Sequence, residues 1–201
     1  MSALSLGIIA AFAWGFHDIC VRYLSQRTPL MASLLVVLIF GLLFHIGVMV
    51  VEDGFAPLTP QTTWMALVSG TFFLMASLGL YGAFQRGPVK LVAPIIASYP
   101  VLSLVWALAR GAQITAWQWG AVIAIIVGVS LVAALAQHDD EDNPPAGPTI
   151  AFSLVAAVGF AGTFALGQYA SEISGHLPVT LVTRIMALAL LIGAMGALHL
   201  P

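Results

Sequence analysis

The 201 residues of this chain are too apolar for a soluble domain, since 61% are hydrophobic and only 7% carry a charge, where a globular protein has about 25%. This composition, with a mean hydropathy of +1.04, predicts an integral membrane protein. The six Lys and Arg residues are scattered along the chain, which excludes a basic face for nucleic acid.

Seven apolar segments are each long enough for a membrane helix, which needs about 20 residues. They cover residues 3–24, 30–51, 63–84, 89–109, 117–136, 149–170 and 178–199. The breaks between them are short and rich in proline, glycine and polar residues, which is typical of turns. We therefore predict an all-α fold, a polytopic membrane bundle of seven transmembrane helices.

The first segment carries the stretch AWGFHDICVRY (13–23), in which three ionisable residues stand among apolar ones. Helical spacing places Trp14, His17, Asp18 and Arg22 on one face. A charge at the bilayer centre costs about 3 kcal/mol or more, so we expect this face to line the bundle interior or a water-filled cavity. Asp18 and Arg22 have the favourable order for an ion pair. Two interpretations stay open: a structural pair, or a cavity wall where Asp18 or His17 exchanges a proton or contacts a cationic group.

Polar and aromatic residues form similar stripes in later segments. Ser77 and Tyr81 lie one turn apart in the third segment, and Tyr99 and Ser103 do so in the fourth. In the seventh segment, Arg184 is the cation that we expect to meet a carboxylate or phosphate group of a solute. The predicted substrate path consists of Trp14, His17, Asp18, Ser77, Tyr81, Tyr99, Ser103 and Arg184.

Three local features predict how the helices are built and packed. Pro94 and Pro100 are expected to interrupt the fourth helix and free backbone carbonyls. His45 stands alone in the second segment, and we expect a backbone carbonyl to satisfy it. Small residues spaced by four favour close helix packing. They occur in the stripes Gly79-Ala83-Gly87, Gly120-Ala124-Gly128 and Gly159-Thr163-Gly167.

The longest break, residues 137–148, is acidic and rich in proline. Its run HDDED (138–142) lacks the spacing and the glycine of a calcium loop, and we interpret it as a solvated linker. The sequence after it, LVAAVGFAGTFALGQYASE, is weakly similar to IIAAFAWGFHDICVRYLSQ near the N-terminus. An odd number of helices in the first unit would invert the second. We predict a five-helix repeat over 1–136 and an incomplete second repeat over 149–201.

The stretch APIIASYPVLSLVWALARGAQITAWQWGAVIAIIVGVSLVA (93–133) resembles the end of an EamA-type repeat of the drug/metabolite transporter superfamily. AWGFHDICVRY resembles the first helix of that repeat, where a small-Trp-Gly pattern is typical. The resemblance implies a carrier of about ten helices, in two inverted halves with a substrate cavity between them. Relatives move amino acids, nucleotide-linked metabolites, vitamins or drugs. The chain departs from the family at Ala112, where a Glu is common, and it ends at Pro201 about three helices early.

The residues and the resemblance together predict a transporter in the bacterial inner (plasma) membrane. We expect it to move a small organic solute, such as an amino acid, a metabolite or an amphipathic drug, by alternating access. No P-loop, HExxH or Ser/His/Asp pattern occurs in the sequence, so we expect no enzyme activity, cofactor or metal. The expected partners are the solute and the lipid bilayer, with a homo-oligomer or a partner chain if the 201-residue chain is complete. The alternative is a truncated, non-transporting homologue that acts as an assembly or regulatory partner.

Overall fold

The computed structural model describes residues 3–136 and 146–198, and this part of the chain is helical with no strand. The helices are α1 (Ala3–Ser25), α2 (Leu30–Val51), α3 (Pro60–Arg86), α4 (Val89–Ile96), α5 (Tyr99–Ala109), α6 (Ala116–Ala136), α7 (Ala146–Ser174) and α8 (His176–Leu198). The HDDED run at 138–142 lies outside the described residues, and the last three positions of the predicted linker begin α7.

The all-α membrane fold is confirmed. Five spans in the described chain are long and apolar enough to cross a membrane, namely α2, α3, α4 with α5, α7 and α8. The remaining helices, α1 and α6, have 23 and 21 residues. At about 1.5 Å per residue, both match a hydrocarbon core about 30 Å thick. They are therefore long enough to complete the seven predicted spans.

The fourth span is broken into α4 and α5, as its prolines predict. Pro94 lies inside α4, and Pro100 lies in the first turn of α5. Proline lacks an N–H, and its ring clashes with the preceding turn. At the break, the Ser98 hydroxyl donates a hydrogen bond to the Ile95 carbonyl at 2.6 Å. The two halves then pack differently, since α4 contacts both α6 and α7 and α5 contacts α7.

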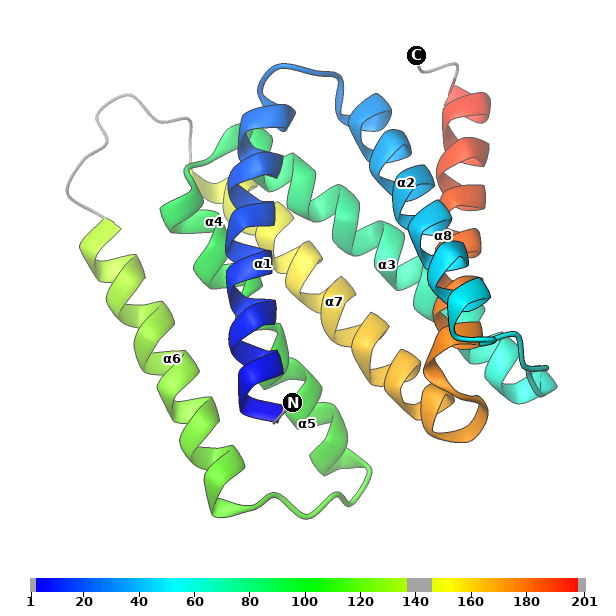
Figure 1. Ribbon diagram of the computed structural model, residues 1–201. Coiled ribbons are helices and arrows are strands. Elements are labelled where there is room, and N and C mark those ends of the chain that lie inside the picture. Colours follow the sequence, from blue (N-terminus) through cyan, green and yellow to red (C-terminus); the bar gives the residue numbers. More distant parts are fainter. Residues whose placement is uncertain (1–2, 137–145, 199–201) are drawn as a thin grey trace.

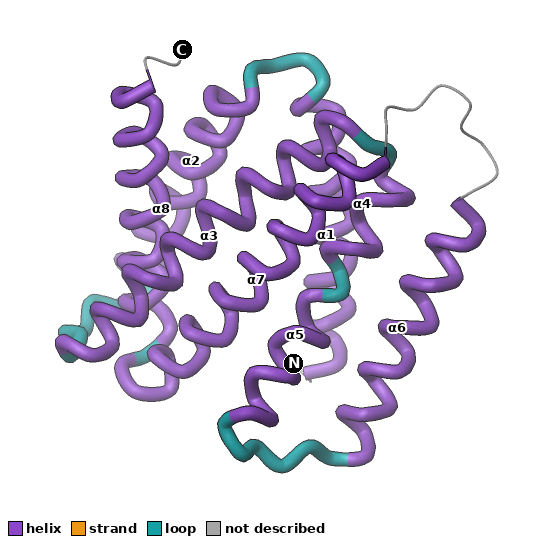
Figure 2. Tube along the Cα trace, turned by 180° about the vertical axis from the view of Figure 1, so that it is seen from behind, coloured by secondary structure: helices purple, strands orange, loops and turns teal. Residues whose placement is uncertain are grey.

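The helix α3 crosses the bundle beside α7, and α8 packs against both (Figure 1). The chain directions are opposed: α1 runs up the page in Figure 1 and α2 runs down, whereas α7 runs down and α8 runs up. The view from behind shows α3 and α7 side by side and α6 at the edge of the bundle (Figure 2). In this bundle α1 therefore runs opposite to α7, and α2 runs opposite to α8.

The contact between α3 and α7 is made by backbone atoms. A Cβ added at Gly79 would lie 2.7 Å from the Ala156 nitrogen, and one at Gly159 would lie 2.7 Å from the Cα of Ala76. Real Cβ atoms do not approach other atoms so closely, and only glycine fits at both positions. The predicted packing through the stripes of Gly79 and Gly159 is confirmed.

The third predicted stripe, on α6, does not pack in this way. A Cβ at Gly120 or at Gly128 would meet no atom within 4 Å among the described residues. The reason is the position of α6 at the edge of the bundle, where its main contact is with α4. The prediction of close packing by this stripe is wrong for the described part of the structure.

A hydrogen bond from His45 joins α2 to α8. Its Nε2 lies 2.9 Å from the carbonyl oxygen of Leu177, and the imidazole must donate because a carbonyl only accepts. The side chain is buried. The prediction that a backbone carbonyl satisfies His45 is confirmed.

Replacing Gly159 by Ala should lower the free energy of unfolding by about 1–3 kcal/mol, because the added methyl forces α3 and α7 apart. Gly167→Ala is the matched control on the same helix, since its Cβ would lie 3.6 Å from the Ser69 hydroxyl, an ordinary contact. That variant should be neutral or more stable by up to about 1 kcal/mol from helix propensity. Unfolding in detergent micelles measures both, and equal losses in the two variants would contradict the close approach.

Replacing His45 by Leu should lower the free energy of unfolding by about 1 kcal/mol, since interhelical hydrogen bonds in membranes contribute about 0.6 and up to about 1.7 kcal/mol. Phe44→Leu serves as the control, because the neighbouring Phe44 side chain is exposed on the outer face of α2. The same unfolding measurement applies. A His45→Leu protein as stable as the control would show that the bond to Leu177 adds nothing.

Candidate functional site

Two of the cavities between the helices are both bordered by Trp14 and Phe160. The first has a volume of about 500 Å³, lies among α1, α3, α7 and α8, and contains Arg184. The second has a volume of about 560 Å³, lies among α1, α4, α5, α6 and α7, and contains Asp18. We call them the Arg184 cavity and the Asp18 cavity.

The two cavities extend toward opposite ends of α3. The Arg184 cavity includes Ser69, in the first half of α3, and His176, the first residue of α8. The Asp18 cavity includes Lys90, in the helix that follows the end of α3. Trp14 and Phe160 thus stand between two cavities that are offset along the bundle.

Aromatic rings form the boundary between the cavities. The rings of Trp14 and Phe160 meet edge to face, with centroids 5.5 Å apart and an angle of 84°. Tyr99 approaches Phe160 at 6.0 Å and Phe164 at 5.1 Å. Such pairs contribute about 0.5–1.5 kcal/mol each beyond the burial of their area. We call Trp14, Tyr99, Phe160 and Phe164 the aromatic cluster.

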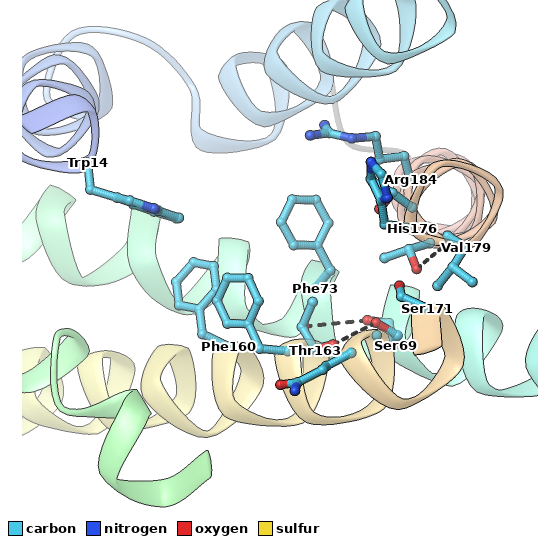
Figure 3. Close-up of a pocket in the computed structure, with 14 residues that line it drawn as sticks. Trp14, Ser69, Phe73, Phe160, Thr163, Ser171, His176, Val179 and Arg184 are labelled. Carbon is cyan, nitrogen blue, oxygen red and sulfur yellow. Dashed lines mark hydrogen bonds between the residues drawn. The ribbon is translucent and has the colours of Figure 1, made fainter. Parts of the chain in front are cut away.

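The boundary ring Trp14 and the cation Arg184 lie at opposite sides of the Arg184 cavity, with Phe73 and Phe160 between them (Figure 3). The hydroxyl of Ser69 donates to the Thr163 carbonyl at 3.0 Å, which ties α3 to α7 along the wall. The cavity thus combines aromatic rings with hydroxyl, amide, imidazole and guanidinium groups.

The charge of Arg184 lies deep in its helix. It is the ninth residue of α8, about 12 Å along from the first. Its Nε is buried and donates to no described residue. A Cβ at Gly41 would lie 2.6 Å from its Nη1, so the glycine of α2 leaves room for the guanidinium. A charge at this depth requires a polar surrounding rather than lipid, and the cavity supplies one.

In the Asp18 cavity, Asp18 is paired with its neighbour in sequence. Its Oδ1 lies 3.3 Å from the Nδ1 of His17, and the two side chains are 17% and 38% exposed. The ring of His17 meets that of Trp14 edge to face, with centroids 5.3 Å apart. The polar face of α1 therefore turns toward the bundle, and its neighbours Val21 and Ser25 are buried.

The predicted ion pair between Asp18 and Arg22 is not formed. Arg22 instead donates a hydrogen bond to the carbonyl oxygen of Phe84, near the end of α3. That carbonyl would normally accept from the N–H four residues later, and this position is Pro88, which has none. Arg22 thus satisfies a carbonyl that the sequence leaves open, as basic side chains do at helix C-termini.

Four residues of the predicted path border neither cavity, namely His17, Ser77, Tyr81 and Ser103. The hydroxyls of Ser77 and Ser103 donate to carbonyls of their own helices, at Phe73 and Tyr99. Tyr81 is buried in the core, and its hydroxyl has no hydrogen-bond partner among the described residues. Four predicted residues do border a cavity: Trp14 borders both, Asp18 and Tyr99 border the Asp18 cavity, and Arg184 borders the other. His17 contacts Asp18 without lining either cavity.

None of the predicted path residues lies on α7, although this helix contributes six residues to the lining of the Arg184 cavity. Phe160, Phe164, Gln168 and Ser171 follow one another at steps of four and three and border the Arg184 cavity. This helical spacing is the signal that would have found them. Within residues 3–136 and 146–198, no three His, Cys, Asp or Glu side chains gather as metal ligands.

Comparisons with known proteins agree with this architecture. The model of the EamA-like transporter family matches residues 1–134, two thirds of the chain. No curated protein and no solved structure matches this chain. Proteins of this family are membrane transporters of the drug/metabolite kind rather than enzymes. The apolar helices and the family match together make this an integral membrane protein, and the chain belongs to the EamA-like transporter family.

Proposed function

We propose that the protein is a carrier that moves a small organic solute by alternating access, with the aromatic cluster as the boundary between two half-paths. The observation that carries this proposal is the pair of cavities that share Trp14 and Phe160 and extend toward opposite ends of α3. Their volumes fall within the range of about 300–1,000 Å³ for small-molecule sites. The family match supports transport of this general kind.

Opposed chain directions support two inverted repeats, which we place at residues 1–136 and 149–201. The pair α1 and α2 runs opposite to the pair α7 and α8, as inverted repeats require. The contact of Trp14 with Phe160 joins α1 to α7, the first helices of the two proposed repeats. Rocking of α1 against α7 opens one cavity while it closes the other. We place the protein in the bacterial inner membrane.

The residues of this mechanism have separate roles. Trp14 and Phe160 separate the half-paths, and Arg184 supplies a positive charge in one of them. Asp18, beside His17, supplies a carboxylate in the other, where it contacts a cationic group or exchanges a proton. Ser77, Tyr81 and Ser103 remain candidates for a path residue in the other conformation of the carrier, in which the helices are differently packed.

Replacing Asp18 by Asn should reduce transport at least tenfold without reducing membrane insertion, because the amide cannot carry the negative charge. Transport is measured in proteoliposomes that contain a mixture of amino acids and amphipathic drugs, with solute loss followed by mass spectrometry. Asp53→Asn is the control, since this carboxylate lies in the loop between α2 and α3. Normal transport by Asp18→Asn would show a structural or idle residue, and no loss of any solute from wild-type liposomes would favour the non-transporting alternative.

Replacing Trp14 by Ala should reduce transport at least tenfold, because the boundary between the cavities loses the ring that both share. Trp14→Phe should keep at least half of the wild-type rate, since phenylalanine can still meet Phe160 edge to face. Trp117→Ala provides the control, as this side chain is 90% exposed at the start of α6. If Trp14→Ala transports as fast as Trp117→Ala, Trp14 and Phe160 do not separate the half-paths.

A further inference from the structure

The charge of the Arg184 cavity is not balanced by the protein. Among the described residues that border it, Arg184 is the only Lys or Arg, and none is Asp or Glu. The Nε of Arg184 is buried, and no described residue accepts a hydrogen bond from it. A buried donor without an acceptor is unfavourable, and a cation inside the membrane normally pairs with an acidic group or with carbonyls. An anion that enters the cavity would supply the partner that the described residues do not.

The guanidinium is held next to a gap in the neighbouring helix. The Nη1 atom lies 2.6 Å from the position that a Cβ of residue 41 would take. Glycine at this point of α2 is what lets the side chain lie in this direction. Gly47, two turns later on the same helix, has nothing within 4 Å of its Cβ position. The close approach is thus specific to Gly41.

The side of the cavity that faces Arg184 carries aromatic rings, while hydroxyl, amide and imidazole side chains line the remainder. Phe73 and Phe160 lie between Arg184 and the ring of Trp14 (Figure 3). Phe164 adds a further ring, stacked on Phe160 with an interplanar angle of 20°. A molecule with an anionic group at Arg184 places its body against these rings, which favour an aromatic partner.

We infer that the solute of this carrier is a small organic monoanion, a carboxylate attached to an aromatic or other flat apolar body, and that Arg184 binds the carboxylate. The inference deepens the proposed carrier function and rests on it. A carboxylate matches the planar fork of the guanidinium in a bidentate way. One guanidinium balances one negative charge, whereas a phosphate dianion would bring an unbalanced charge into the membrane interior.

Three probes with the same ring test this assignment: indole-3-acetate, its neutral amide indole-3-acetamide, and the cation tryptamine. Binding is measured by isothermal titration calorimetry with the purified protein in lipid nanodiscs, and empty nanodiscs give the background. The acetate should bind at least tenfold more tightly than the amide, and tryptamine should bind weakest. Equal binding of acetate and amide would overturn the inference, and so would tighter binding of inorganic phosphate than of indole-3-acetate in the same titration.

Two substitutions locate the preference at Arg184. Arg184→Gln should weaken acetate binding at least tenfold and leave amide binding within twofold. Gly41→Ala keeps the charge but displaces the guanidinium, and the displacement is cheap for folding because the obstructing atom is the end of a flexible side chain. It should reduce the preference for acetate several-fold, while the matched Gly47→Ala keeps it. A wild-type preference in both Arg184→Gln and Gly41→Ala would contradict the site.

The failure of this inference can be told apart from failure of the carrier function. Binding in nanodiscs needs no transport, so a protein that binds indole-3-acetate through Arg184 but does not move it in proteoliposomes contradicts the carrier and supports the anion site. Transport of neutral or cationic solutes by the wild-type protein, at a rate that the Arg184→Gln variant matches, would contradict the anion site and support the carrier.

Discussion

The backbone contact between α3 and α7 is the constraint on which the other features depend. In lipid, no hydrophobic effect drives helices together, and association relies on close packing. Gly79 and Gly159 permit this packing, since a Cβ at either would collide with the facing backbone. Because the contact fixes the rotation of α7, it also aims Phe160 and Phe164 at Trp14 and Tyr99. The geometry of the aromatic cluster is therefore a consequence of two glycines outside it.

Each charge inside the bundle is handled in a different way. Arg22 satisfies the carbonyl of Phe84, which Pro88 leaves without its usual donor. Asp18 lies beside His17 in a cavity that it shares with Lys90. Each of these groups meets a polar neighbour, whereas the Nε of Arg184 meets none among the described residues. The contrast separates Arg22, whose charge serves the fold, from Arg184, whose Nε has no partner among the described residues.

The sequence predicts well the features that arise within a single helix, and it predicts poorly the contacts between two helices. The break at Pro94 and Pro100 and the inward face of α1 follow from local rules, and both were predicted. The predicted ion pair of Asp18 with Arg22 is wrong. Helical spacing shows which residues share a face, but it does not show which acceptors a neighbouring helix offers to Arg22. The sequence shows that Pro88 cannot donate to the Phe84 carbonyl. It does not show that α1 approaches this end of α3 and brings Arg22 to that carbonyl. The small-residue stripe of α6 failed similarly, since no helix in the described structure lies against it.

In the proposed carrier, the Arg184 cavity joins the inferred anion site to the movement between the two repeats. Arg184 belongs to α8, in the second proposed repeat, while Gly41, which makes room for its guanidinium, belongs to α2 in the first. Any rotation of one repeat against the other changes this distance and with it the position of the guanidinium. A ligand that binds one arrangement better than the other shifts the population toward it. An anion at Arg184 is thus placed where its binding energy acts directly on the balance between the two conformations, so that a single residue pair links recognition of the solute to its translocation.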